Sequence, residues 1–159
     1  MKSFYIGMVS MLFSSLTFAS EPNSIIWRDL VNTESTASSV FEKTNPDLDG
    51  KQVVIPGFVI VNNVANELGE GHSVEAGTLN PDLPVITVLS PQRDICFHTP
   101  PPPANQLIQL KMDPGVNVED SKGKPVYLVG TLKVEKHLSG LFSTAYTLQV
   151  SETLPYPTQ

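Results

Sequence analysis

The chain has 159 residues, a length that fits one domain on the usual expectation of about 100–200 residues per domain. Its formal net charge is −6, and its 10 basic side chains are scattered among 16 acidic ones. Nucleic-acid-binding surfaces need clustered Lys and Arg. Because the basic residues here are scattered, we expect no nucleic-acid partner.

The first 19 residues have the layout of a secretory signal peptide. A basic Lys2 precedes an apolar run over residues 4–16, and the small-residue site Thr17-Phe18-Ala19 predicts cleavage after Ala19. The run is shorter than the roughly 20 residues of a membrane-spanning helix, and no later stretch is long and apolar enough to span. We therefore expect a periplasmic protein, a single β domain over residues 20–159, with no membrane span after cleavage.

The mature N-terminal part predicts little regular structure. Apolar residues grouped within 21–32 predict a short helix that packs Trp27 onto the domain. Residues 35–50 are polar and rich in turn signals, and a helical turn is expected over residues 40–43.

Residues 51–61 predict the first strand, because they are β-branched and aromatic. Pro56-Gly57 in its middle predicts a bulge or bend, of the kind that turns a barrel corner. The long polar connection that follows, residues 62–83, is of a length that is usually functional or mobile.

Four further strands are predicted, each from β-branched composition or from apolar and polar residues in alternation. A loop or short helix is expected over residues 136–143. The predicted strands cover residues 84–90, 107–112, 125–134 and 144–151.

About five strands separated by turn-rich loops predict an all-β fold. The interpretation that we favour is a small five-stranded antiparallel barrel of the oligonucleotide/oligosaccharide-binding type, with short peripheral helices. The alternative is a two-sheet β-sandwich.

The candidate site is the stretch DICFHTPPPPANQ, residues 94–106. Cys96 is the only cysteine of the chain, and on extended backbone it shares a face with His98. Pro100 to Pro103 predict a polyproline II rod, so this pair is presented from stiff backbone. Thiolate and imidazole are both zinc ligands, which makes zinc the expected metal.

A zinc site needs at least three protein ligands. His72, in the long connection, is the expected third, and Asp94 is a candidate to orient His98. The remaining candidates are His137, interpreted as a surface histidine, and the carboxylates of Glu70 and Glu75.

Other interpretations of the motif stay open. Cys96 with His98 could act as a nucleophile, although side chains two apart on a strand must converge to meet, and we rank catalysis below metal binding. Cys96 could equally be a buried small hydrophobe, with the prolines covering a strand edge.

The same stretches carry a resemblance. The chain resembles a family of small exported bacterial proteins known only as a domain of unknown function, whose block of Cys, His, prolines, Asn and Gln matches CFHTPPPPANQ. One departure is SPQRD, residues 90–94, where the family has an aromatic residue and a glycine. The supporting segments are IIWRDL (25–30), DGKQVVIPGFVI (49–60), VGTLKV (129–134) and AYTLQV (145–150).

Members of this family tend to sit beside transport systems associated with metal uptake, so the resemblance implies an association with such a system. It implies no particular reaction. We therefore expect an accessory binding protein of zinc homeostasis, with a metal-uptake transporter or envelope protein as partner. The alternative function is a non-catalytic structural or interaction module that docks such a partner without metal.

Overall fold

The computed structural model describes residues 21–63, 85–93, 95, 101–119, 121–138 and 143–157. Three short 3-10 helices occur there: η1 (Trp27–Leu30), η2 (Pro46–Leu48) and η3 (Ala104–Gln106). None of the helices in these ranges is long and apolar enough to cross a membrane. The strands are β1 (Asn23–Ser24), β2 (Gln52–Asn63), β3 (Val85–Ser90), β4 (Ile108–Met112), β5 (Val126–Leu138) and β6 (Ser143–Pro155).

The predicted all-β class with short peripheral helices is therefore confirmed. The predicted signal peptide, residues 1–19, lies outside the described residues, as does nearly all of the connection over residues 62–83. Both remain predictions.

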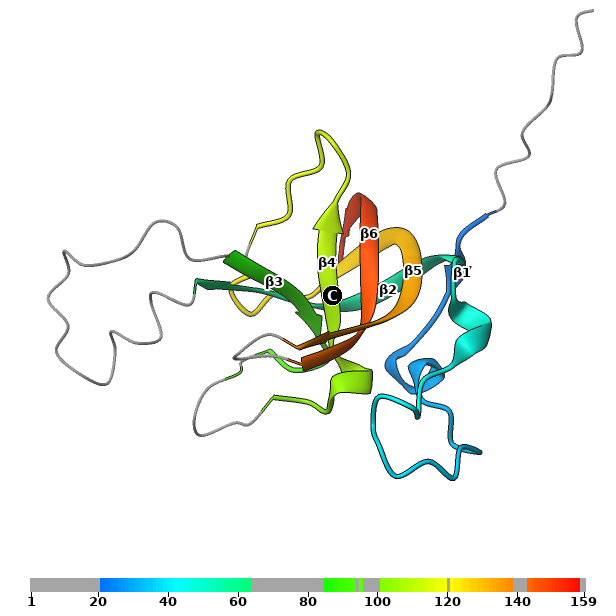
Figure 1. Ribbon diagram of the computed structural model, residues 1–159. Coiled ribbons are helices and arrows are strands. Elements are labelled where there is room, and N and C mark those ends of the chain that lie inside the picture. Colours follow the sequence, from blue (N-terminus) through cyan, green and yellow to red (C-terminus); the bar gives the residue numbers. More distant parts are fainter. Residues whose placement is uncertain are drawn as a thin grey trace, which may run out of the picture.

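The six strands form one mixed sheet in the order β1-β2-β3-β4-β6-β5, and β2 also pairs with β5. Strands β2 to β6 therefore form a closed ring of hydrogen-bonded pairings, with β1 added outside β2 (Figure 1). The described strands belong to one sheet, so the two-sheet alternative is not what the structure has.

The prediction that the strands are all antiparallel is wrong. Strand β4 runs parallel to β6, and the added β1 runs parallel to β2. The other four pairings of the ring are antiparallel. A closed ring with an odd number of strands cannot reverse direction at every step, so five strands require one parallel pairing.

The first strand changes partner at Pro56-Gly57, and its pairings show no bulge of the predicted kind there. Strand β2 is continuous, but it pairs with β5 as far as Gly57 and with β3 from Phe58 onward. A Cβ added to Gly57 would lie 2.8 Å from Cγ of Leu89, so the close approach of β3 at this point requires glycine.

The buried faces of the last strands follow the predicted alternation. Tyr146, Leu148 and Val150 of β6 are completely buried, as is Ile108 of β4. The alternation of β4 does not extend to its end, because Met112 is one-third exposed. The inner faces of the ring strands thus form the main apolar core.

Strand β5 departs from ideal pairing at two places. Its register with β6 shifts between Val129 and Gly130, and again between Val134 and His137. A Cβ on Gly130 would overlap the carbonyl oxygen of Gln149, so only glycine fits there. The predicted loop or helix over residues 136–143 is wrong for residues 136–138, because β5 continues to Leu138 and a bulge absorbs the irregular pattern.

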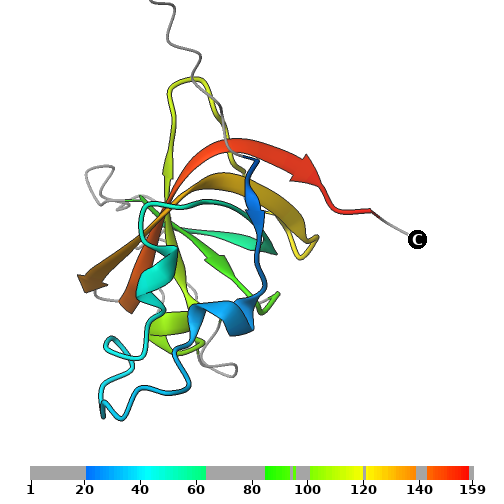
Figure 2. The ribbon, with the colours of Figure 1, turned by 90° about the vertical axis from the view of Figure 1, so that its right-hand side faces the viewer.

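The N-terminal segment, residues 21–50, packs along one side of the ring in Figures 1 and 2. Strand β1 pairs with β2, and the predicted packing of Trp27 is confirmed. Its indole Nε1–H donates to the carbonyl of Pro56 at 2.8 Å. The buried Tyr146 hydroxyl donates to the Leu30 carbonyl at 2.5 Å and accepts from the Asn45 backbone N–H at 2.7 Å.

Candidate functional site

The predicted ligands Cys96, His98 and His72 lie outside the described residues, as does Asp94. No cluster of three or more His, Cys, Asp or Glu side chains that could hold a metal occurs elsewhere in the described ranges. The zinc site therefore remains a prediction, and the structure describes what flanks it.

The chain entering the Cys96–His98 segment is held on the sheet by apolar contacts. After β3 ends at Ser90, the half-buried Ile95 packs against a small cluster built on the completely buried Val88 and on Leu107. This cluster is separate from the main core. Leu89, the neighbour of Val88, packs in the main core instead. The residue directly before Cys96 is thus fixed against β3.

The chain leaving the segment is held more firmly. Pro102 is buried, and Asn105 is only 4% exposed. The Asn105 side-chain amide donates to the Lys43 carbonyl at 3.1 Å, which ties η3 to the N-terminal segment. Pro103, at φ −59° and ψ 154°, has the backbone conformation of the predicted polyproline rod.

The third predicted ligand connects to the opposite end of β3. Asn63 and Val85 are paired partners, so both ends of the connection that carries His72 lie at the start of β3. The start and end of this six-residue strand are about 17 Å apart at strand rise. The nine residues from Asn63 to His72 span up to about 30 Å when extended, which is more than the length of β3.

His137 proves to be more than a surface histidine. Its Nε2 lies 2.8 Å from the Thr147 hydroxyl and 3.1 Å from Oε2 of Glu135. The Thr147 hydroxyl donates to Oε2 of Glu135 at 3.1 Å, so the three side chains form one hydrogen-bonded cluster. Because its Nε2 is engaged in this cluster, we do not expect His137 to be the third zinc ligand.

The same contacts act on the acid. Hydrogen bonds from His137 and then Thr147 hold the pKa of the Glu135 carboxyl below its usual 4.5, and Lys111, whose Nζ lies 3.6 Å away, adds a smaller attraction. The pattern Glu-x-His on a strand is the sequence signal for this cluster.

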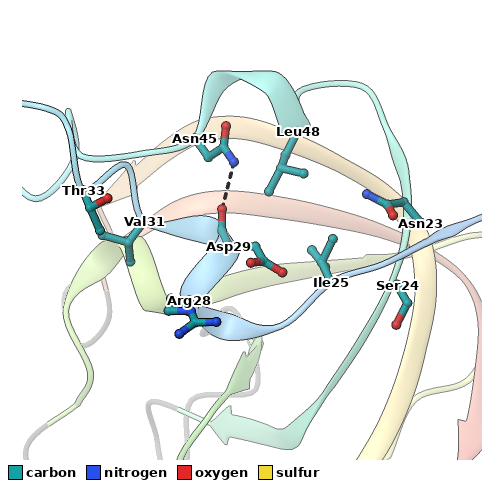
Figure 3. Close-up of a pocket in the computed structure, with 9 residues that line it drawn as sticks. All are labelled: Asn23, Ser24, Ile25, Arg28, Asp29, Val31, Thr33, Asn45 and Leu48. Atoms are coloured by element: carbon teal, nitrogen blue, oxygen red, sulfur yellow. Dashed lines mark hydrogen bonds between the residues drawn. The ribbon is translucent and has the colours of Figure 1, made fainter.

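A second candidate site is an open groove of about 580 Å³ between β1 and the 3-10 helices η1 and η2 (Figure 3). Ile25 and Leu48 form an apolar floor, and they are only 3% and 7% exposed. The charged lining residues are Arg28 and Asp29, neighbours on η1. The remaining lining residues are Asn23, Ser24, Val31, Thr33 and Asn45.

Hydrogen bonds fix the walls of this groove. Oδ2 of Asp29 accepts from the Ile26 backbone N–H at 2.9 Å, and the Asn45 side-chain amide donates to the Asp29 carbonyl at 2.9 Å (Figure 3). Asn45 in turn accepts from the Asp47 N–H at 3.1 Å. No local sequence pattern signals this groove, because it forms only when residues 23–33 meet residues 45–48.

Comparison with known proteins supports the fold and leaves the function unassigned. The family model DUF3299, described as a protein of unknown function, matches residues 85–155, a range that includes the proline block. The structure is similar to the crystal structure of a DUF3299 family protein from Pseudomonas aeruginosa PAO1, with a TM-score of 0.59 and 23% sequence identity. That likeness covers 87% of this chain and 98% of the other, and at this identity it shows the fold alone. No curated protein matches.

Proposed function

We propose that the protein is a periplasmic accessory binding protein of transition-metal homeostasis that binds zinc through Cys96 and His98. The observation that carries the proposal is the fixing of both flanks of this pair. Ile95 packs against β3 on one side, and Pro102 and Asn105 are buried on the other. A segment held at both ends loses less conformational entropy when its side chains converge on an ion.

The donor set supports zinc among the metals. Thiolate sulfur and imidazole nitrogen are ligands that zinc prefers in tetrahedral sites, at about 2.3 Å and 2.0–2.1 Å. His72 is the proposed third ligand, and Asp94 is the residue proposed to orient His98. Binding weakens as acid protonates the thiolate and the imidazole.

The ring of strands supports the finer fold proposal, a small barrel of the oligonucleotide/oligosaccharide-binding type. The order β2-β3-β4-β6-β5, returning to β2, gives a closed five-stranded arrangement with one parallel pairing. Within this proposal the Cys96–His98 segment follows the third of the six strands in the chain.

Calorimetric titration of the mature chain with zinc tests the function. We expect one zinc per chain, a loss of tight binding in Cys96→Ala and His98→Ala, and a smaller weakening in His72→Ala. His137→Ala is the matched control, because His137 is a histidine already engaged with Thr147, and it should bind zinc as the parent does.

Equal and weak binding by the parent and all four variants would contradict the proposal. That result would favour the alternative function, a non-catalytic module that docks a metal-uptake transporter or envelope partner without metal. Under that alternative, Cys96→Ser leaves the function of the protein intact.

A further inference from the structure

The groove between β1, η1 and η2 carries an inference that is independent of zinc. We propose that it binds a free α-amino acid with an aliphatic side chain. Such a ligand has one negative group, one positive group and one apolar group, all attached to a single carbon. The groove offers a matching partner for each within one concave surface (Figure 3).

The carboxylate of the ligand pairs with Arg28. Arg28 lines the groove at an exposed position, and within the described part of the chain it has no ion-pair partner. A guanidinium presents paired N–H donors in a planar fork, and this fork matches the two oxygens of a carboxylate. An arginine that faces a groove without a protein carboxylate of its own is suited to an anionic ligand group.

The ammonium group pairs with Asp29. Its Oδ2 accepts from the Ile26 N–H, which orients the carboxylate, while Oδ1 accepts no hydrogen bond from the other described residues. Arg28 and Asp29 both line the groove, so it offers one positive and one negative side chain for the two charges of a zwitterion. Asn45 supplies a fixed wall, since its amide N–H and its oxygen are both engaged.

The apolar group of the ligand packs on the floor. Ile25 and Leu48 are buried there, and the half-buried Val31 flanks them. All three side chains are aliphatic, so they present no aromatic face for stacking and no polar group for a polar side chain. The volume of about 580 Å³ falls within the range of about 300–1,000 Å³ that is usual for small-molecule sites.

The test uses leucine as the probe, added to the isotope-labelled mature chain and followed by amide chemical shifts. We expect saturable shifts at residues 23–33 and 45–48 at leucine concentrations up to about 10 mM. Leucinamide, which lacks the carboxylate, and N-acetylleucine, which lacks the ammonium, should each bind about tenfold more weakly, since a charged hydrogen bond contributes about that factor.

Two variants assign the charges to residues. Arg28→Gln should weaken leucine about tenfold while equalising leucine and leucinamide. Asp29→Asn retains an oxygen for the Ile26 N–H and should equalise leucine and N-acetylleucine. Arg93→Gln is the control, because Arg93 is the other arginine of the chain and contacts Gly123 away from the groove.

Absence of leucine-dependent shifts at these residues would overturn the proposal. Equal binding of leucine and its two derivatives would also overturn it. Neither Arg28 nor Asp29 belongs to the proposed zinc site, so this experiment and the zinc titration fail or succeed separately.

Discussion

The contacts that stabilise the strand ring differ from those that attach the N-terminal segment, residues 21–50, to it. The ring consists of long pairings in fixed register around completely buried side chains such as Leu128 and Leu148. The N-terminal segment has only three short elements, β1, η1 and η2. It attaches to the ring through the two-residue pairing of β1 with β2, a few hydrogen bonds, and the core residues Ile25, Leu30 and Leu48. Stability of the ring is therefore distributed over many paired residues, whereas the segment is attached by fewer contacts, so each one contributes a larger share.

This difference matters because both candidate sites are connected to the N-terminal segment. The groove between β1, η1 and η2 is built entirely from residues of the N-terminal segment. The chain that leaves Cys96–His98 is tied to the same segment, because Asn105 binds the Lys43 carbonyl. Changes in the ring should affect the whole fold, and changes at the junction should affect the sites first.

The largest expected effect is on the ring. Gly130→Ala places a Cβ against the backbone carbonyl of Gln149, which cannot move without disturbing the pairing of β5 with β6. We expect a loss of about 3 kcal/mol or more in the free energy of unfolding, measured by urea denaturation. Gly115→Ala is the control, because no atom lies near its added Cβ and only its positive φ is strained, at a cost of about 1–2 kcal/mol. Equal losses in the two variants would show that the close approach at Gly130 is unimportant.

The next effect is at the junction. Tyr146→Phe leaves the Leu30 carbonyl and the Asn45 N–H without their shared partner, at a cost of about 1–3 kcal/mol. Because the ring remains, hydrogen exchange should accelerate at residues 30 and 45 more than in β5 and β6. Tyr156→Phe, at an exposed position, should change neither quantity. Uniform acceleration across the ring would mean that the segment and the ring unfold as one unit.

The same tyrosine should make the fold less stable at high pH. Burial raises the pKa of Tyr146 above 10, and the hydrogen bond from Asn45 lowers it less. A group whose pKa is raised by folding stabilises the fold below its unfolded pKa, and this stabilisation is lost as the pH rises through the folded value. The parent should therefore lose stability more steeply than Tyr146→Phe above pH 10, in denaturation curves measured across that range. Parallel pH profiles would contradict this.

A smaller effect is expected at the strap, which is the hydrogen bond from the Asn105 side chain to the Lys43 carbonyl. Asn105→Ala removes one buried hydrogen bond to Lys43 and should cost about 1 kcal/mol. Under the zinc proposal it should also weaken zinc binding, since one flank of the Cys96–His98 segment loosens. A variant that is less stable but binds zinc like the parent would show that the strap has no part in the site.

The smallest expected effect is the loss of the Glu135 contribution to stability at low pH. The pKa of Glu135 is lowered by folding, so its contribution is present above pH 4.5 and is lost as the pH falls through the lower, folded value. Glu135→Gln should therefore differ from the parent at neutral pH and converge with it in acid. High salt should reduce the difference, because the carboxylate is exposed and easily screened. A constant difference at every pH would exclude a role for its charge.

The ring could largely be predicted from the sequence, because its strands alternate apolar and polar residues and Pro56-Gly57 mark the change of partner. The parallel pairing could also have been predicted, since five strands cannot close a ring without one. The extension of β5 to Leu138 could not, because the bulge between Val134 and His137 breaks the period of two.

The sites were less predictable than the ring. The groove joins residues 23–33 to residues 45–48 through a fold-dependent contact, and no local pattern signals it. The role of His137 depends on Thr147, which is ten residues away and reaches it only through the pairing of β5 with β6. The Cys96–His98 motif is visible in the sequence, but two spaced ligands alone do not specify a metal site.

X-ray absorption at the zinc edge tests the central claim most directly, in the mature chain loaded with one equivalent of zinc. The account predicts a coordination shell with one sulfur at about 2.3 Å and imidazole nitrogens at about 2.0–2.1 Å, and loss of the sulfur in Cys96→Ala. A shell of light atoms only, identical in the parent and in Cys96→Ala, would contradict it.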